Sequence, residues 1–308
     1  MSALDVILSG TMLAQTARMT IPYGCAALGG VLSERSGVVN IALEGTLLAS
    51  ALASVAACHA SGSAAVGIVA GVTCGAMVGL VHALLVVRGR VDAIVSGIAL
   101  NLVAAGGTRF LLRALYGSSS NSPSIQGLRF GEDWGLLART LLDPFLLATI
   151  AAVAAAAWML RRTRFGLRLR ACGEDPSAAQ AVGVHVTGMR TAAVALGGAV
   201  TGLGGTALAY DLHQFQAGMS GGRGFIALAA VIVSGWRPWP AAAACLAFAA
   251  LDALQIVLQN QTKLPSQVLA MLPFVATLVA LVLVSKRLGK RDAGAMQPPA
   301  GLGKHPAS

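Results

Sequence analysis

Charged residues are scarce in this chain of 308 residues. Only 11% are Asp, Glu, Lys or Arg, whereas 56% are hydrophobic, and a soluble domain carries about 25% charged residues. So few charges cannot coat a globular surface, which excludes a soluble domain. The apolar residues come in long runs, and hydrocarbon requires each backbone N–H and C=O to be satisfied within its own segment, so we expect membrane-crossing helices. A transmembrane barrel would need short alternating segments instead.

Motifs for catalysis and metal binding are also absent. The sequence contains no GxxxxGKS/T nucleotide-binding loop, no GxSxG elbow and no HExxH pair. Its cysteines form no CxxC pair and are not spaced for a zinc site or a disulfide framework, so we expect small core residues: Cys25, Cys58, Cys74, Cys172 and Cys245. We therefore predict no catalytic residue, no metal site and no cofactor in this chain.

The formal net charge of +10 does not indicate a nucleic-acid-binding protein. The basic residues sit in short gaps between apolar runs, not on one face with interleaved aromatic residues. Lys and Arg in such gaps mark the cytoplasmic side of a membrane protein. We therefore expect the densest group to face the cytoplasm: Arg161, Arg162, Arg164, Arg168, Arg170 and Arg190. This orientation places the N-terminus outside if the first apolar run crosses once, and inside if it crosses twice.

The apolar runs predict an all-α polytopic bundle of about 8–10 spans, since a span needs about 20 residues. The nine candidates are 4–32, 38–58, 64–87, 93–115, 141–160, 191–210, 224–235, 240–258 and 267–285. The first contains Pro22 and is either kinked or split. The run 224–235 is too short to cross and predicts a re-entrant or broken helix. We expect a transmembrane domain over 1–290 and a disordered cytoplasmic tail over 291–308.

The loop 161–190 holds one short helix with strong local signals. Asp175 suits the N-cap, Pro176 the first helical position and Gly183 the C-terminal stop. This helix presents Ala178, Ala181 and Val182 outside the membrane, where a soluble partner's groove can accept them. The alternative is a solvated connector with no partner.

Small residues form a stripe in the third predicted span. Gly67, Gly71, Gly75 and Gly79 are four residues apart, and Gly198 and Gly202 repeat this spacing in the sixth span. Glycine at this spacing lets helix backbones approach closely, so the stripe predicts tight packing.

Polar residues inside apolar runs are costly and usually face the bundle interior or a water-filled pathway. The candidates are Asn40, Glu44, Asn101, Arg109, Asp252, Gln255 and Gln259. The pairs Asn40–Glu44 and Gln255–Gln259 are each four residues apart, so each pair is expected to share a helix face. Such a stripe could bind the hydroxyls and ring nitrogens of a polar solute. The alternative is interhelical hydrogen bonding that only fixes packing.

Three segments resemble a known family. Residues 30–45 (GVLSERSGVVNIALEG), 165–183 (FGLRLRACGEDPSAAQAVG) and 222–229 (GRGFIALA) are similar to segments of permeases in the branched-chain amino acid/ribose/nucleoside ABC importer superfamily. They most resemble the nucleoside (guanosine-type) branch, and the similarity covers nearly the whole chain. One departure is Asp175, where the family usually has Asn, but both residues cap helices well.

The resemblance implies a permease subunit in the bacterial inner membrane. Its expected partners are a cytoplasmic ATP-binding subunit, a second permease subunit, identical or not, and an extracytoplasmic solute-binding protein. The expected solute is a nucleoside or purine-like compound, or a sugar. Phe225, in the third segment, joins the pathway candidates. The resemblance further implies that a coupling helix docks on the ATPase through Gly173, Glu174, Asp175, Pro176, Ala178, Ala181, Val182 and Gly183.

The sequence is also compatible with two other hypotheses. An ion-coupled secondary transporter would use Asp252 and Glu44 as ion or proton sites. A structural membrane protein would carry no solute at all. The energy source distinguishes a secondary transporter from an ATP-driven importer, because only secondary transport survives ATP depletion and collapses with the ion gradient.

Overall fold

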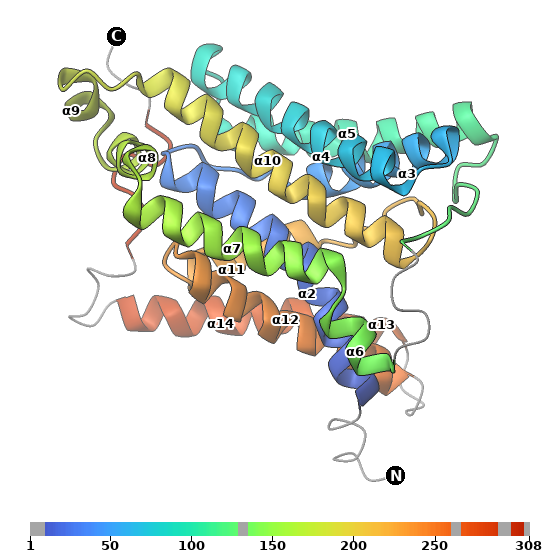
Figure 1. The fold of residues 1–308 in the computed structure, drawn as a ribbon. Coiled ribbons are helices and arrows are strands. Elements are labelled where there is room, and N and C mark those ends of the chain that lie inside the picture. Colours follow the sequence, from blue (N-terminus) through green and yellow to red (C-terminus); the bar gives the residue numbers. More distant parts are fainter. Residues whose placement is uncertain (1–9, 129–134, 260–265, 289–296, 305–308) are drawn as a thin grey trace.

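The computed structural model describes residues 10–128, 135–259, 266–288 and 297–304, and the regular elements within these ranges are helices (Figure 1). They are α2 (Gly10–Arg35), α3 (Leu43–Ser61), α4 (Ala64–Ala83), the π-helix η1 (Leu84–Arg88), α5 (Ala93–Tyr116), α6 (Leu136–Leu141), α7 (Pro144–Arg162), α8 (Arg164–Glu174), α9 (Pro176–Ala181), α10 (Val186–Asp211), α11 (Arg223–Val233), α12 (Pro238–Gln259), α13 (Ser266–Ala270) and α14 (Leu272–Leu288). The predicted helical bundle is confirmed.

The long helices lie alongside one another, and the bundle has two distinct ends. One end carries α8, α9 and the C-terminal segment (Figure 1). The opposite end carries the connections that follow α5 and α10, which are joined by a β-bridge between Asn121 and Gln216. Below, these are called the α8–α9 end and the far end.

In the described ranges, six helical stretches are long and apolar enough to cross a membrane. They are Leu43–Ser61, Ala64–Arg88, Ala93–Tyr116, Ala138–Arg162, Val186–Asp211 and Pro238–Gln259. Helix α2 has 26 residues and lies inside the bundle, because all residues from Ile21 to Glu34 are buried by protein. It packs on α10, α12, α11 and α7, which makes it the central helix. Pro22 lies within this one continuous helix, so the described part of the first run is not split.

The glycine stripe packs α4 against α10, as the spacing predicted. A Cβ atom added to Gly75 would lie 2.4 Å from the carbonyl oxygen of Gly198. One added to Gly79 would lie 2.6 Å from the carbonyl oxygen of Val194. Both distances are far below van der Waals contact, so only glycine permits this backbone approach.

The short helix predicted over 224–235 is α11, with 11 residues. Its length of about 16 Å is half of the hydrocarbon thickness of about 30 Å. The backbone N–H groups of Gly222 and Gly224, at its start, donate to Glu44 of α3, so α11 begins inside the bundle.

Several predicted boundaries were wrong. The second span begins at Leu43 instead of 38, because residues 36–42 are not helical. The fifth begins three residues later than predicted, with α7 at Pro144, after the separate short helix α6. The ninth comprises two helices, α13 and α14. Helix α8 was missed, because its three arginines obscured the apolar face, which buries Leu169 and Cys172.

Within the tail that was predicted to be disordered, the structure describes residues 297–304. They form a turn against the α8–α9 end, where the backbone N–H of Gly301 donates to the carbonyl of Gly173 at 2.8 Å. The other tail residues, 291–296 and 305–308, lie outside the described residues.

Candidate functional site

Helix α3 begins inside the bundle after a non-helical segment, residues 36–42. Asn40 orders this segment, because its Nδ2 donates to Ser33 Oγ (3.0 Å) and its Oδ1 accepts from the N–H of Ala42 (3.2 Å). Asn101 of α5 donates to the carbonyl of Ile41 (2.9 Å) and accepts from the N–H of Gly45 (2.7 Å). Asn101 lies about 12 Å along α5, whose length is about 36 Å. The start of α3 is therefore about one third of the way through the bundle.

Glu44 joins the start of α3 to the start of α11. Its Oε1 accepts from the N–H of Gly222 and its Oε2 from the N–H of Gly224, both at 2.7 Å. The first N–H groups of a helix have no partner within the helix and carry a partial positive charge, so a carboxylate there is stabilised. Gly224 permits this contact, since a Cβ at this position would lie 2.4 Å from the backbone nitrogen of Glu44.

A charged cluster lies on the other side of the α11 start. Arg223 Nη2 contacts Asp252 Oδ2 of α12 at 3.3 Å, and the same oxygen accepts from the hydroxyl of Tyr23 of α2 at 3.3 Å. The Arg223 guanidinium also lies 6.0 Å from the centroid of the Tyr23 ring. Within the described part of the chain, Arg223 Nε is buried without an acceptor. Breaking such a buried pair leaves an uncompensated charge, so the cluster holds three helices together.

The structure separates the predicted pathway residues into groups. Asn40 and Glu44 do not share a helix face, because Asn40 precedes α3. Asp252 belongs to the charged cluster, whereas Gln255 and Gln259 lie one and two turns further along α12 and are half-buried. Arg109 is exposed on α5.

The start of α11 also presents an aromatic side chain. Phe225 is 49% exposed on its first turn. Neither Tyr23 nor Arg223 was predicted as a site residue, although Arg223 lies in the family-like segment 222–229, which was the available signal.

The segment predicted to form a coupling helix, residues 173–183, has the expected local structure. Asp175 caps α9 by accepting from the N–H groups of Ser177 (3.0 Å) and Ala178 (2.9 Å). Pro176 occupies the first turn, and Gly183 ends the segment with φ of +82°. Three small apolar residues are exposed, namely Ala178, Ala181 and Val182, and Val182 is 79% exposed. The exposed surface of this segment is therefore small and apolar.

The base of this segment is fixed by close backbone packing. A Cβ on Gly173 would lie 2.2 Å from the carbonyl oxygen of Arg35. Glu174 lies 3.8 Å from Arg35 in an ion pair. Helix α8 thus meets the end of α2 directly.

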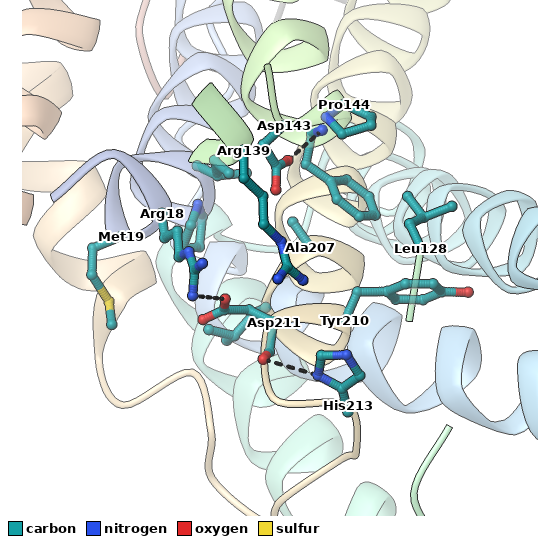
Figure 2. Close-up of a pocket in the computed structure, with 14 residues that line it drawn as sticks. Arg18, Met19, Leu128, Arg139, Asp143, Pro144, Ala207, Tyr210, Asp211 and His213 are labelled. Atoms are coloured by element: carbon teal, nitrogen blue, oxygen red, sulfur yellow. Dashed lines mark hydrogen bonds and ion pairs between the residues drawn. The ribbon is translucent and has the colours of Figure 1, made fainter. Parts of the chain in front are cut away.

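A polar cavity lies at the far end, between α2, α7 and α10, with a volume of ≈ 110 Å³. Arg18, Arg139 and Asp211 point into the same space (Figure 2). Arg18 pairs with Asp211 at 3.5 Å, and His213 contacts the carbonyl of Asp211 at 3.3 Å. The space holds a few waters or one small polar group, since a cavity that admits benzene measures about 150 Å³.

Comparison with known proteins covers nearly the whole chain. A family model described as the permease component of branched-chain amino acid transport systems matches residues 12–282. The chain is 34% identical to the guanosine ABC transporter permease protein NupQ of Bacillus subtilis, over 94% of either chain. It is 34% identical to the nucleoside ABC transporter permease protein NupC of Lactococcus lactis, over 92% of this chain and 93% of that one. It is also 33% identical to the putative glucose ABC transporter permease protein TsgC13 of Haloferax volcanii, over 76% and 74%.

Proposed function

The chain belongs to the permease component family of branched-chain amino acid transport systems, and on that premise we propose that it imports a nucleoside or purine-like solute. The observation that carries the proposal is its 34% identity to the guanosine and nucleoside permeases across almost their full length. The glucose permease matches a smaller share of the chain, which favours a nucleoside over a sugar.

The solute pathway is proposed to pass the point where α3 and α11 begin. Transporters commonly bind solutes near the membrane midplane, at the ends of interrupted helices. Here Glu44 joins the starts of two such helices, α3 and α11. Phe225, on the first turn of α11, has an exposed aromatic ring. The charged pair Arg223–Asp252 lies next to the start of α11. An aromatic ring can stack on a purine base, while polar groups can form hydrogen bonds with the ring nitrogens of the base and the hydroxyls of the sugar. Gln255 and Gln259 extend this polar surface along α12.

Energy is proposed to enter at the α8–α9 end, on the cytoplasmic side. Arginines are dense at this end and mark the cytoplasm. Helix α9 would dock its exposed small residues on the ATP-binding subunit, and ATP-driven closure would shift the bundle between outward-open and inward-open states. The far end would then face the solute-binding protein, with a second permease subunit completing the pathway in the bacterial inner membrane.

Uptake by the reconstituted complex tests this function. The chain is placed in proteoliposomes with its second permease and ATP-binding subunits, ATP inside and the loaded binding protein outside. We expect uptake of radiolabelled guanosine that unlabelled nucleosides suppress, that glucose leaves unchanged and that an ionophore does not reduce. Uptake of glucose but not guanosine would overturn the solute class, and uptake that needs an ion gradient but no ATP would overturn the mechanism.

A further inference from the structure

The described C-terminal residues, 297–304, lie between the end of α8 and the loop after α2 (Figure 1). They are separated in sequence from both by more than a hundred residues. Two backbone hydrogen bonds hold them: Gly301 N–H donates to the carbonyl of Gly173 (2.8 Å) and Gly303 N–H to that of Gly37 (3.0 Å). This segment, residues 297–304, is called the strap below.

The strap contacts the junction between α8 and α9. The N–H of Ala300 donates to Glu174 Oε2 at 3.2 Å. Gly301 is buried, and a Cβ there would lie 2.8 Å from the carbonyl oxygen of Gly173 and 2.9 Å from Pro176 Cδ. The strap therefore touches the last residues of α8 and the first residue of α9.

Arg190 connects the strap to the bundle. This side chain of α10 is 2% exposed. Its Nη1 donates to the carbonyl of Lys304 (2.6 Å), its Nη2 to that of Cys172 (3.1 Å) and its Nε to that of Ser36 (3.0 Å). One guanidinium thus links the strap, the end of α8 and the loop after α2 to α10.

Apolar contacts add to this attachment. Leu302 packs against buried hydrophobic residues of the bundle core, a cluster that includes Val31 of α2 and Leu169 of α8, and Pro299 is buried. An accidental surface contact would not bury the strap's own proline and glycine while satisfying a buried arginine.

We propose that the strap is a positioning element, which ties the α8–α9 junction to α2 and α10 so that movement of α9 reaches the core of the bundle. The inference rests on the proposed coupling role of α9. A single residue, Asp175, separates α8 from α9, and its backbone is extended. Such a junction transmits a displacement of α9 to α8 only if neighbouring contacts hold it in place. The strap supplies these contacts at the last residues of α8 and the first residue of α9.

The test compares three variants in the full complex. A chain ending at Met296 lacks the strap, and Gly301→Val forces it away from Gly173 and Pro176. Lys304→Ala is the matched control, because the contact with Arg190 uses only the backbone carbonyl of Lys304. The first readout is the ratio of solute transported to ATP hydrolysed, which should fall about 2- to 30-fold in the first two variants and not in the control.

The second readout needs no solute, so it separates failure of the strap from failure of the proposed function. A spin label is attached to Val182→Cys in a Cys74→Ala background, and its mobility is measured. Truncation and Gly301→Val should increase label mobility on α9, with thermal stability of the bundle retained. Unchanged mobility in both variants, or an unchanged transport ratio when uptake is measurable, would overturn the proposal.

Discussion

At the scale of single residues, the buried polar groups act as ties between segments that are distant in sequence. Asn40, Asn101 and Glu44 each satisfy backbone groups left free where a helix is interrupted. An unpaired backbone group in hydrocarbon is costly, so interrupted helices need such side chains. A role in packing and a role beside the pathway are therefore compatible for Glu44.

Replacing Glu44 with Gln tests this role. Glu44 uses both carboxylate oxygens, one for each glycine N–H, so an amide must turn its NH₂ toward one donor. We expect Glu44→Gln to lower the free energy of unfolding by about 1–3 kcal/mol, measured by thermal unfolding in detergent.

Asp92→Asn is the matched control for this change. Asp92 accepts from the N–H groups of Ile94 and Val95 through one oxygen, Oδ1, so the amide nitrogen can take the unused position. Asn also caps helices as well as Asp. Equal destabilisation by both variants would contradict the argument.

At the scale of helices, close backbone contact between α4 and α10 governs how the bundle packs. Gly75→Ala places a methyl group 2.4 Å from a carbonyl oxygen, so we expect destabilisation of about 1–3 kcal/mol. Gly106→Ala is the control, because a Cβ there meets nothing within 4 Å and alanine favours a helix interior by up to about 1 kcal/mol. The unfolding midpoint should fall in Gly75→Ala and should stay the same or rise in Gly106→Ala. A smaller decrease of the unfolding midpoint in Gly75→Ala than in Gly106→Ala would refute the packing role.

Helix α9 offers a second test at this scale. Ala181 is exposed, so Ala181→Trp should leave membrane insertion and the unfolding midpoint unchanged. If α9 docks in a partner groove, the bulky side chain should abolish co-purification of the ATP-binding subunit and reduce uptake severely. Normal co-purification together with normal uptake would argue against docking.

At the scale of the whole molecule, the orientation in the membrane decides which partner meets which end. Cys172 is a poor reporter of orientation, because it is fully buried and burial raises the pKa of its thiol, which leaves little reactive thiolate at neutral pH. Val182 and Ser119 are exposed at opposite ends of the bundle.

Labelling at these two positions therefore tests the topology. An impermeant maleimide added to intact cells should label Ser119→Cys and not Val182→Cys, and cell disruption should expose the second. Because the described part of α2 is one continuous helix, the N-terminal side of α2 should share the accessibility of Ser119. Labelling of Val182→Cys in intact cells would show that the chain has the opposite orientation.

The sequence by itself determined the features that depend on neighbouring residues. Hydrophobic runs predicted helices because lipid forces local backbone pairing, and Asp175, Pro176 and Gly183 defined α9 because caps act within one turn. The tertiary structure alone decided that Arg190, counted among the cytoplasmic arginines, is buried, and that the tail is attached to it. Those contacts join residues more than a hundred positions apart, and no local pattern encodes which distant carbonyl a buried guanidinium will meet.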